Sequence, residues 1–522
     1  MALENYGTVS KEIAVDSAME SRVPAQLTTR AQVNGYRFLL RRLDHALVRR
    51  DVRMLHDPMR SQIRSLLVGL VLGILVIAGA AILAFLRPQG AIGDALIVSG
   101  KSSGALYVVV EKEDGSRTLH PALNLASARL ITGSNAEPHA VKDDKLGDLP
   151  RGPLLGIPGA PAALPGSAQG GDSHWSLCES IELSAGGSAA SAVGATTTVV
   201  GGAPNLTDRI RAAGPAEALL VTRDDKTYLI YDGKRAEIDP DDSVVARALD
   251  LPAHRPRPVG TGFLGATTQV APLKAPVIDR AGESGPGPLA EVPVGGIISV
   301  ASVGGDARPE MYVVLANGVQ PVSPFAAEVI RYADSQGMSE VPVLPPDVLD
   351  EIPVVQRLPV ADFPGEIPEI VSAEDGPVTC IAWSKSPGTA PAEEGAGDGP
   401  GERAAVGLLI GTELPIPDSA EPVRLATADS SGDRVDAVYV EPTHGEYVQI
   451  TGMEPGSPRR GSLFYVADNG IRYGVPDPAT AGVLGLGDTP HLAPWAILGQ
   501  LVPGPTLDRR EALVSHDSLT EG

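Results

Sequence analysis

The chain is poor in aromatic residues and in cysteine. Only 4% of its 522 residues are Phe, Trp or Tyr, and it has two cysteines. A chain of this length can bury a large core, which excludes a small scaffold that depends on disulfides for stability. Gly and Pro number 59 and 47, about a fifth of the chain, and they disfavour long helices outside a membrane segment. The composition therefore favours an α+β fold of short strands, turns and loops.

Motifs for catalysis and metal binding are also missing from the sequence. The nine histidines are scattered, without HExxH or another paired ligand spacing, so no metal site is expected. There is no G-x-S-x-G motif. Ser515, His516 and Asp517 are consecutive, which points their side chains in different directions rather than into a catalytic triad. We therefore assign no catalytic residue and no metal ligand.

One short stretch partly matches a phosphate-binding loop. Gly100, Lys101 and Ser102 fit the end of G-x-x-x-x-G-K-[ST], but the first glycine of that motif falls on Ala95. Apolar residues typical of strands lie on both sides, whereas a phosphate-binding loop opens a helix. Two interpretations stay open: a nucleotide site that binds ATP, or a solvated turn between two strands. The flanking residues favour the turn, and no cofactor is then expected.

A single long apolar run lies in the N-terminal part of the chain. Residues 65–86 contain no charge and no proline, and Arg64 and Arg87 flank them. As a helix they would span roughly 33 Å, enough to cross the hydrocarbon core of a bilayer. The 64 residues upstream do not fit a signal peptide. We therefore expect one transmembrane helix, which divides the chain into residues 1–64, 65–86 and 87–522.

The charges on the two sides of the apolar run differ in sign. Residues 1–64 hold eleven Lys or Arg against seven Asp or Glu, which leaves 31 basic and 57 acidic residues, a net charge of −26, for the rest of the chain. Because basic flanks stay on the cytoplasmic side of a membrane, residues 1–64 are predicted to be cytoplasmic. Residues 87–522 then form a large extracytoplasmic domain, whose acidity argues against nucleic acid as a partner.

The cytoplasmic segment contains an amphipathic helix. Thr29 and Gln32 have the spacing of a capping box, and apolar residues recur from Val33 to Leu47 at steps of three and four. Arginines lie on the opposite face. We interpret this helix as lying on the inner membrane surface or docking on a cytoplasmic protein. The candidate partner-binding residues are Arg37, Arg41, Arg42, Arg49, Arg50 and Arg53.

Both cysteines belong to the extracytoplasmic domain. Cys178 and Cys380 each have a tryptophan three residues away, Trp175 and Trp383. An oxidising compartment favours a disulfide between them. Two unrelated buried thiols are the alternative.

Four segments of the extracytoplasmic domain share one pattern. Each has an apolar strand with a tyrosine, a Gly-centred turn, a second short strand, a proline and then a short helical stretch. Such turns favour tight hairpins, because Gly and Asn tolerate positive φ. We therefore predict about four β-hairpin/helix repeats around a central β-rich core, with core strands within 296–303, 436–440 and 447–450. The turns are Asp114-Gly115, Asp232-Gly233, Asn317-Gly318 and Asn469-Gly470.

Two low-complexity stretches interrupt the domain, residues 150–171 and 386–402. The second cannot bury enough apolar surface to become ordered, so we predict an exposed, flexible loop there. Two acidic runs, 142–145 and 239–242, are interpreted as helix caps and solvated turns rather than calcium sites.

The stretch from Thr29 to Gly90 resembles the EccB family of the type VII (ESX) secretion systems of mycobacteria and their relatives. The resemblance continues through the first repeat (GALYVVV and LHPALNLASARLI), GIPGAP at 156–161, both cysteine contexts and PWAILGQLVPGPTL at 494–507. It covers nearly the whole chain after residue 28. The resemblance implies a single-pass component of the inner (cytoplasmic) membrane, with a cytoplasmic N-terminal helix and a dimerising periplasmic domain that a disulfide bridges.

The same resemblance implies a function and partners. The family assembles the export channel together with an EccC-type motor ATPase and EccD- and EccE-type membrane subunits. That channel exports folded helical pairs of the WXG100 and PE/PPE type. The family is often labelled as an ATPase, and its repeats are said to be similar to cell-wall-binding modules. We therefore expect a structural and assembly subunit, with an ATP-hydrolysing subunit or a peptidoglycan-binding anchor as alternatives.

Overall fold

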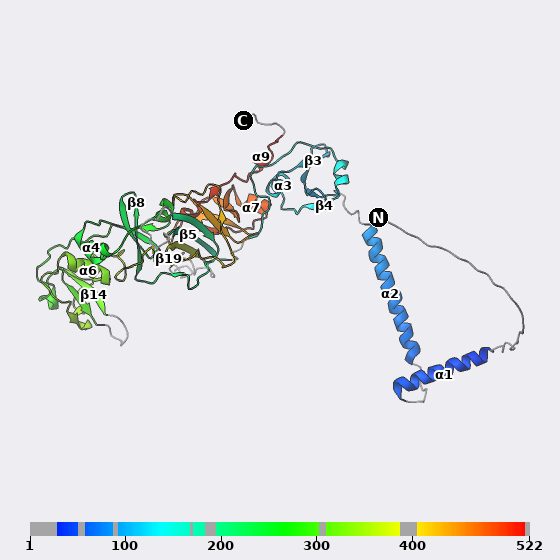
Figure 1. The fold of residues 1–522 in the computed structure, drawn as a ribbon, viewed down its shortest axis with the longest axis horizontal. Coiled ribbons are helices and arrows are strands. Elements are labelled where there is room, and N and C mark those ends of the chain that lie inside the picture. Colours follow the sequence, from blue (N-terminus) through cyan, green and yellow to red (C-terminus); the bar gives the residue numbers. More distant parts are fainter. Residues whose placement is uncertain are drawn as a thin grey trace, which may run out of the picture. The chain divides into compact units, whose positions relative to one another are not determined.

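The computed structural model describes residues 29–50, 58–86, 92–166, 171–182, 195–301, 309–386 and 404–516. The chain forms two compact units, Met1–Gln89 and Gly90–Gly522, and Figure 1 shows their helices and strands. Almost all of the predicted flexible loop 386–402 lies outside the described residues.

The first helix, α1 (Arg30–Arg49), begins at the predicted capping box. The backbone N–H of Thr29 donates to Oε1 of Gln32 at 2.9 Å, which satisfies one end of that box. The helix ends where Arg50 takes a left-handed conformation with φ 55°. The predicted amphipathic helix is therefore confirmed, together with the residue that starts it.

The second helix, α2 (Pro58–Leu86), contains the predicted membrane segment. Its stretch Ile63–Leu83 has a mean hydropathy of 3.0, and none of that stretch is buried inside the protein. An apolar helix of this length that has no protein cover fits the hydrocarbon core of a bilayer.

The second unit contains a central sheet of seven strands in the order β20-β21-β6-β5-β18-β19-β7. Its middle pair, β5 and β18, is antiparallel and joins residues 173–180 to residues 378–385. The strands are β5 (Ser173–Ile181), β6 (Ala195–Gly201), β7 (Ile210–Ala212), β18 (Val378–Lys385), β19 (Ala405–Gly411), β20 (Val423–Arg424) and β21 (Ala437–Val440).

Four smaller sheets have one common connectivity, and we call them units A to D in chain order. A first strand pairs with a hairpin, a short helix follows, and a last strand returns to lie parallel to the first. Unit A has β1 (Ile97–Gly100), β2 (Leu106–Glu111), β3 (Arg117–Pro121), α3 (Leu125–Thr132) and β4 (His139–Val141). Unit B has β8 (Glu217–Arg223), β9 (Lys226–Tyr231), β10 (Lys234–Ile238), α4 (Ser243–Ala248) and β11 (Arg257–Pro258).

The remaining two units follow the same plan, and each predicted glycine turn joins the two hairpin strands of one unit. Unit C has β13 (Ile297–Val300), β14 (Glu310–Leu315), β15 (Gly318–Val322), α6 (Pro324–Ala333) and β16 (Val343–Leu344). Unit D has β22 (Gly445–Thr451), β23 (Leu463–Ala467), β24 (Ile471–Val475), α7 (Pro478–Leu484) and β25 (His491–Pro494).

Short elements complete the Gly90–Gly522 part of the chain. Strands β12 (Thr268–Gln269) and β17 (Glu369–Ile370) extend the sheet of unit B, and β26 (Val502–Pro503) extends that of unit D. The short helices are α5 (Thr261–Gly265), α8 (Trp495–Leu498), α9 (Arg509–Ala512), η1 (Asp143–Asp148), η3 (Leu251–Ala253), η4 (Gly287–Leu289) and η5 (Pro346–Leu349).

Two of the three strands predicted for the central core are placed elsewhere. The segment 436–440 does supply β21 of the central sheet, but 296–303 and 447–450 supply β13 and β22, the first strands of units C and D. The prediction was wrong because it began each repeat at the hairpin. A buried strand that precedes a hairpin carries no signal to say which sheet it joins.

Helix contacts join the four units in pairs. In one shared core, Leu130 of α3 packs with Leu484 of α7, which joins unit A to unit D. In a second core, Val245 of α4 packs with Phe325 of α6, which joins unit B to unit C. Units B and D also contribute to the main core on one face of the central sheet. The central sheet therefore holds both pairs of units through their inner members.

Two hairpin turns press directly on the central sheet. A Cβ atom at Gly233 of unit B would lie 2.6 Å from Val406 on β19, and one at Gly470 of unit D would lie 2.7 Å from Val438 on β21. Both glycines also have positive φ, +70° and +80°. Gly115 of unit A has a similar φ of +77°, but a Cβ there would meet nothing within 4 Å.

Replacing each of these three glycines by alanine is expected to lower stability by different amounts. Gly115→Ala is expected to cost about 1–2 kcal/mol, because a left-handed conformation is unfavourable for an L-residue. Gly470→Ala and Gly233→Ala are expected to cost a further 1–3 kcal/mol or so, because the new methyl group overpacks a well-filled contact. Thermal unfolding of the full chain in detergent measures the difference. Equal losses of stability in all three variants would mean that the turns at Gly233 and Gly470 do not contact the central sheet.

Candidate functional site

The arginines predicted to bind a partner belong to α1 and its C-terminal end. Arg37, Arg41 and Arg42 are exposed on the helix, and Arg50 is exposed just after it, whereas Arg53 lies outside the described residues. The sixth candidate, Arg49, is the last residue of α1. The apolar face is uncovered as well: Tyr36, Leu43 and Leu47 are 65%, 59% and 73% exposed. A helix with an open apolar stripe beside a cationic face is suited to dock on a membrane surface or a protein.

Gly100 is the last residue of β1, and Lys101 and Ser102 lie in the turn that leads to β2 and does not open a helix. Asp143 of η1 holds this turn, because its carboxylate accepts hydrogen bonds from the Ser102 backbone N–H and the Ser103 hydroxyl, each at 3.0 Å. An anionic side chain thus occupies the place at the backbone amide where a phosphate would have to bind. Lys101 is exposed at this turn. The geometry favours the interpretation as a turn.

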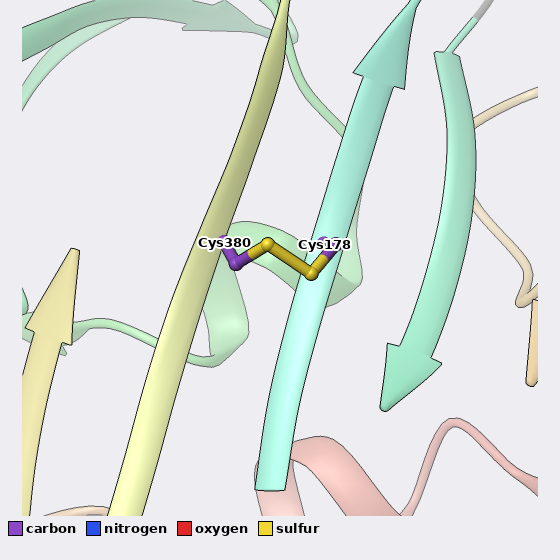
Figure 2. Close-up of a disulfide and its surroundings, with 2 residues drawn as sticks. All are labelled: Cys178 and Cys380. Atoms are coloured by element: carbon purple, nitrogen blue, oxygen red, sulfur yellow. A yellow bond between two sulfur atoms is a disulfide. The ribbon is translucent and has the colours of Figure 1, made fainter. Parts of the chain in front are cut away.

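The predicted disulfide is confirmed, and it joins Cys178 and Cys380 (Figure 2). The two cysteines are direct partners in the β5–β18 ladder, with Cα atoms 3.9 Å apart and a sequence separation of 202. Trp175 and Trp383 form another direct pair three residues along, so their side chains lie on the opposite face of the sheet. The disulfide and the tryptophan pair therefore fix the middle of the central sheet from both sides.

A buried polar cluster lies at one end of the main core, on the same face as the tryptophans. At its centre is Glu179 of β5, which is 2% exposed. Its Oε1 accepts a hydrogen bond from the Gly260 backbone N–H at 2.8 Å, while its Oε2 has no hydrogen-bond partner within the described part of the chain. Burial raises the pKa of this carboxyl to about 8, although the nearby Arg257 and Arg223 act in the other direction.

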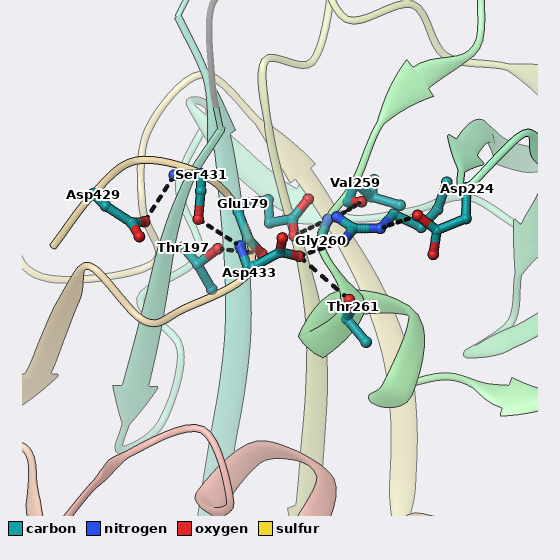
Figure 3. Close-up of polar contacts among 11 residues, drawn as sticks. Glu179, Thr197, Asp224, Val259, Gly260, Thr261, Asp429, Ser431 and Asp433 are labelled. Carbon is teal, nitrogen blue, oxygen red and sulfur yellow. Dashed lines mark hydrogen bonds and ion pairs between the residues drawn. The ribbon is translucent and has the colours of Figure 1, made fainter. Parts of the chain in front are cut away.

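Two loops meet above Glu179 (Figure 3). The segment 259–261 follows β11, and the segment 429–433 precedes β21. The Asp433 carboxylate accepts from the Thr261 hydroxyl at 3.3 Å and pairs with the Arg223 guanidinium at 2.7 Å. A Cβ at Gly260 would lie 1.6 Å from the Gly432 carbonyl oxygen. The two loops can therefore close only with a glycine at position 260.

A cavity of about 460 Å³ lies beside this cluster, lined by His254, Arg255, Arg257 and Glu374 among other residues. Arg257 is 3% exposed, and its guanidinium donates to the carbonyl oxygens of Val371, Ser372 and Gly376. Its burial lowers the pKa of the guanidinium to about 10. Because carbonyls hold its donors, Arg257 serves as a structural support for the loop 371–376. No group of His, Cys, Asp or Glu suited to hold a metal occurs in the described ranges.

The sequence analysis missed the cluster around Glu179. Its members Glu179, Arg223, Gly260 and Asp433 are separated by 37 residues or more along the chain, so spacing gives no sign of them. One local signal was available: Glu179 falls at an apolar position of the strand-like alternation formed by Trp175, Leu177 and Ile181. A carboxyl in such a position is costly to bury and therefore unusual.

Comparison with known proteins places the chain among components of one secretion system. The family model described as "Type VII secretion system ESX-1, transport TM domain B" matches residues 25–521. The chain is 37% identical to the ESX-3 secretion system ATPase EccB3 of Mycolicibacterium smegmatis, an alignment that covers 94% of this chain and 91% of the relative. It is 36% identical to the ESX-5 secretion system ATPase EccB5 of Mycobacterium tuberculosis, with 94% of each chain covered.

Solved structures give the same relationship. A chain of an intact ESX-5 inner membrane complex is 33% identical, with a TM-score of 0.66, and the match covers 96% of this chain and 98% of that chain. A chain of the EccB3 dimer from the ESX-3 core complex is 33% identical with a TM-score of 0.65, and the match covers 80% of this chain and 100% of that one. A chain of the periplasmic assembly from the ESX-5 complex is 34% identical with a TM-score of 0.64, covering 84% and 100%.

Removal of the disulfide is expected to lower stability without changing the strand register. In the double variant Cys178→Ser, Cys380→Ser the unfolded chain regains loop entropy, and the expected loss is about 2–5 kcal/mol. The measurement is thermal unfolding of the full chain in detergent, with and without a reducing agent. On reduction, the unfolding midpoint of the wild type should fall to that of the double variant. The midpoint of the double variant should not change with the reducing agent. A midpoint unaffected by reduction in both would contradict this role.

Replacement of Lys101 is expected to leave any ATP turnover unchanged, because Asp143 already occupies the amide of the turn. The measurement compares phosphate release from ATP by the purified full chain and by its Lys101→Ala variant. Lys112→Ala, which removes an exposed lysine at the other end of β2, serves as the matched control. Turnover that disappears only with Lys101→Ala would instead establish a phosphate site at this turn.

Proposed function

The chain belongs to the EccB family of type VII secretion proteins, and we propose that it is a structural and assembly subunit of an ESX inner-membrane complex. The observation that carries this proposal is the extent of the match. The periplasmic and dimer structures cover 84% and 80% of the chain, and Gly90–Gly522 makes up 433 of its 522 residues. The intact inner membrane complex covers 96%, so α1 and α2 belong to the shared architecture.

The topology of the chain follows from the same comparison. The apolar part of α2 crosses the inner membrane once, the Gly90–Gly522 unit lies in the periplasm, and α1 lies on the cytoplasmic side, where its arginines agree with the preference of basic flanks. The relative from the ESX-3 core complex forms a dimer, and we extend dimerisation through the periplasmic unit to this chain. Its task is to connect the cytoplasmic parts of the export channel to the periplasmic parts.

The cationic face of α1 is proposed as the docking surface for other subunits of the channel. An EccC-type motor ATPase and EccD- and EccE-type membrane subunits are the proposed partners, and proteins of the WXG100 and PE/PPE type are the proposed cargo. The support lies in the exposed arginines and the uncovered apolar stripe of one helix. Such a helix gains stability when a partner covers both faces.

Nucleotide hydrolysis by this chain is the second candidate, because the relatives carry ATPase in their names. The turn at Gly100–Ser102 gives it weak support, since Asp143 bonds to that turn. In the proposed function, energy for export comes from a motor subunit, and this chain supplies attachment.

Neutralising the arginine face tests the docking role. The variant Arg37→Gln, Arg41→Gln, Arg42→Gln keeps good helix formers but removes three positive charges. We expect it to remain in the membrane while co-purification of the motor subunit and secretion of WXG100 proteins fall at least about tenfold, the loss expected for roughly 1.4 kcal/mol of binding energy. The measurements are affinity purification of the complex and immunoblotting of culture filtrate in a strain that lacks the native chain.

The matched control replaces three exposed arginines of the periplasmic unit, Arg424, Arg509 and Arg510, by glutamine in the same strain. This control should purify with its partners and secrete normally. Normal assembly and secretion by the α1 variant would show that the arginine face is not the docking surface.

A further inference from the structure

The cluster around Glu179 joins parts of the periplasmic unit that are distant in sequence. Glu179 belongs to the central sheet, Gly260 follows unit B, and the loop 429–433 precedes β21 on the far side of β6. Arg223 at the end of β8 reaches across to Asp433. The cluster therefore connects unit B to the central sheet, and unit C is carried along through the contact of α4 with α6.

The immediate surroundings of Glu179 are polar but incompletely bonded. Its direct ladder partners are Thr379 on β18 and Thr197 on β6, so these side chains share its face of the sheet. The Thr379 hydroxyl is buried and, like Oε2 of Glu179, has no hydrogen-bond partner in the described part of the chain. An ionised carboxylate can only accept hydrogen bonds, whereas a protonated one also donates. The Thr379 hydroxyl can itself donate, yet it makes no hydrogen bond to Oε2 in the described part of the chain, so Oε2 is buried without the donor that an ionised oxygen requires.

The cations near Glu179 are already engaged. Arg257 donates to three carbonyl oxygens of the loop 371–376. Arg223 pairs with Asp433 and Asp224 and donates to the Val259 carbonyl. The Asp433 carboxylate also faces Glu179 and disfavours a second negative charge there. A carboxylate at Glu179 thus has positive neighbours but gains no full ion pair with either of them.

We propose that Glu179 is a proton-dependent clasp: with its proton in place the loops 259–261 and 429–433 stay closed over the central sheet, and loss of the proton opens them. The physical reason is solvation. A buried carboxylate with one unbonded oxygen needs water, and the contact between Gly260 and Gly432 forms the layer above it. Water can reach the carboxylate when that contact separates, which loosens unit B from the central sheet.

The raised pKa of Glu179, about 8, sets the direction and the window of the effect. An unfolded chain loses this proton near pH 4.3, while the folded chain keeps it. Between these values the native state binds more protons than the unfolded state, so stability falls as pH rises. The decrease ends above about pH 8, where both states are ionised. The clasp should therefore be closed in mildly acidic conditions and open in alkaline ones.

Hydrogen–deuterium exchange of the full chain in detergent tests the clasp. After correction for the intrinsic pH dependence of exchange, protection of the Gly260 amide and of 429–433 is expected to fall between about pH 5 and about pH 8. The expected size is up to about tenfold per pH unit below about pH 8, because a single proton controls opening, and protection should level off above that pH. In the Glu179→Gln variant, which is neutral at every pH, protection should stay high and constant over the same range.

Glu217→Gln is the matched control. Glu217 also lies in unit B, but its hydrogen bonds with Arg211 lower its pKa to about 2, so it stays ionised throughout the window. This control should keep the pH dependence of the wild type. A wild-type chain with pH-independent protection at these amides would overturn the proposal, and so would an unchanged pH dependence in Glu179→Gln. If Glu179→Gln fails to fold, the wild-type measurement alone decides.

Discussion

The periplasmic unit depends on the pairing of β5 with β18. These two strands come from positions about 200 residues apart, and the ladder between them brings together the segments on which everything else packs. Bringing such distant segments together costs chain entropy, which grows with the length of the loop. The disulfide between Cys178 and Cys380 reduces that cost, because the cross-link limits the conformations open to the unfolded chain.

The two faces of this strand pair have different tasks. On one face Trp175 and Trp383 begin the main core, to which units B and D both contribute. On the other face the disulfide lies in a smaller apolar cluster with Val200 and Leu409. Few aromatic residues are available in this chain, and two of its three tryptophans lie side by side at this point of the core. The outer units A and C then attach through helices to D and B.

The sequence was informative wherever a local rule decides the structure. The capping box at Thr29, the apolar run of α2 and the glycine turns at Gly233 and Gly470 were all recognisable, because each depends on backbone chemistry within a few residues. The cysteine pair was found because only two cysteines exist. The first strands of the units were misplaced, since β13 and β22 have the same apolar composition as strands of the central sheet. Local composition does not show which distant strands pair with one another.

The candidate site also has one part that the sequence predicts and one part that it does not, for a different reason. The arginines of α1 could be proposed from helical periodicity, whereas Glu179, Arg223 and Asp433 come together only in the folded chain. Natural sequences tend to avoid burying a carboxyl unless something compensates for its lost hydration. Here the compensation is incomplete, with one oxygen bonded to Gly260 and the other unbonded. Local rules that are broken without full compensation are expected at functional or strained positions, and this incomplete compensation is the reason for proposing the clasp at Glu179.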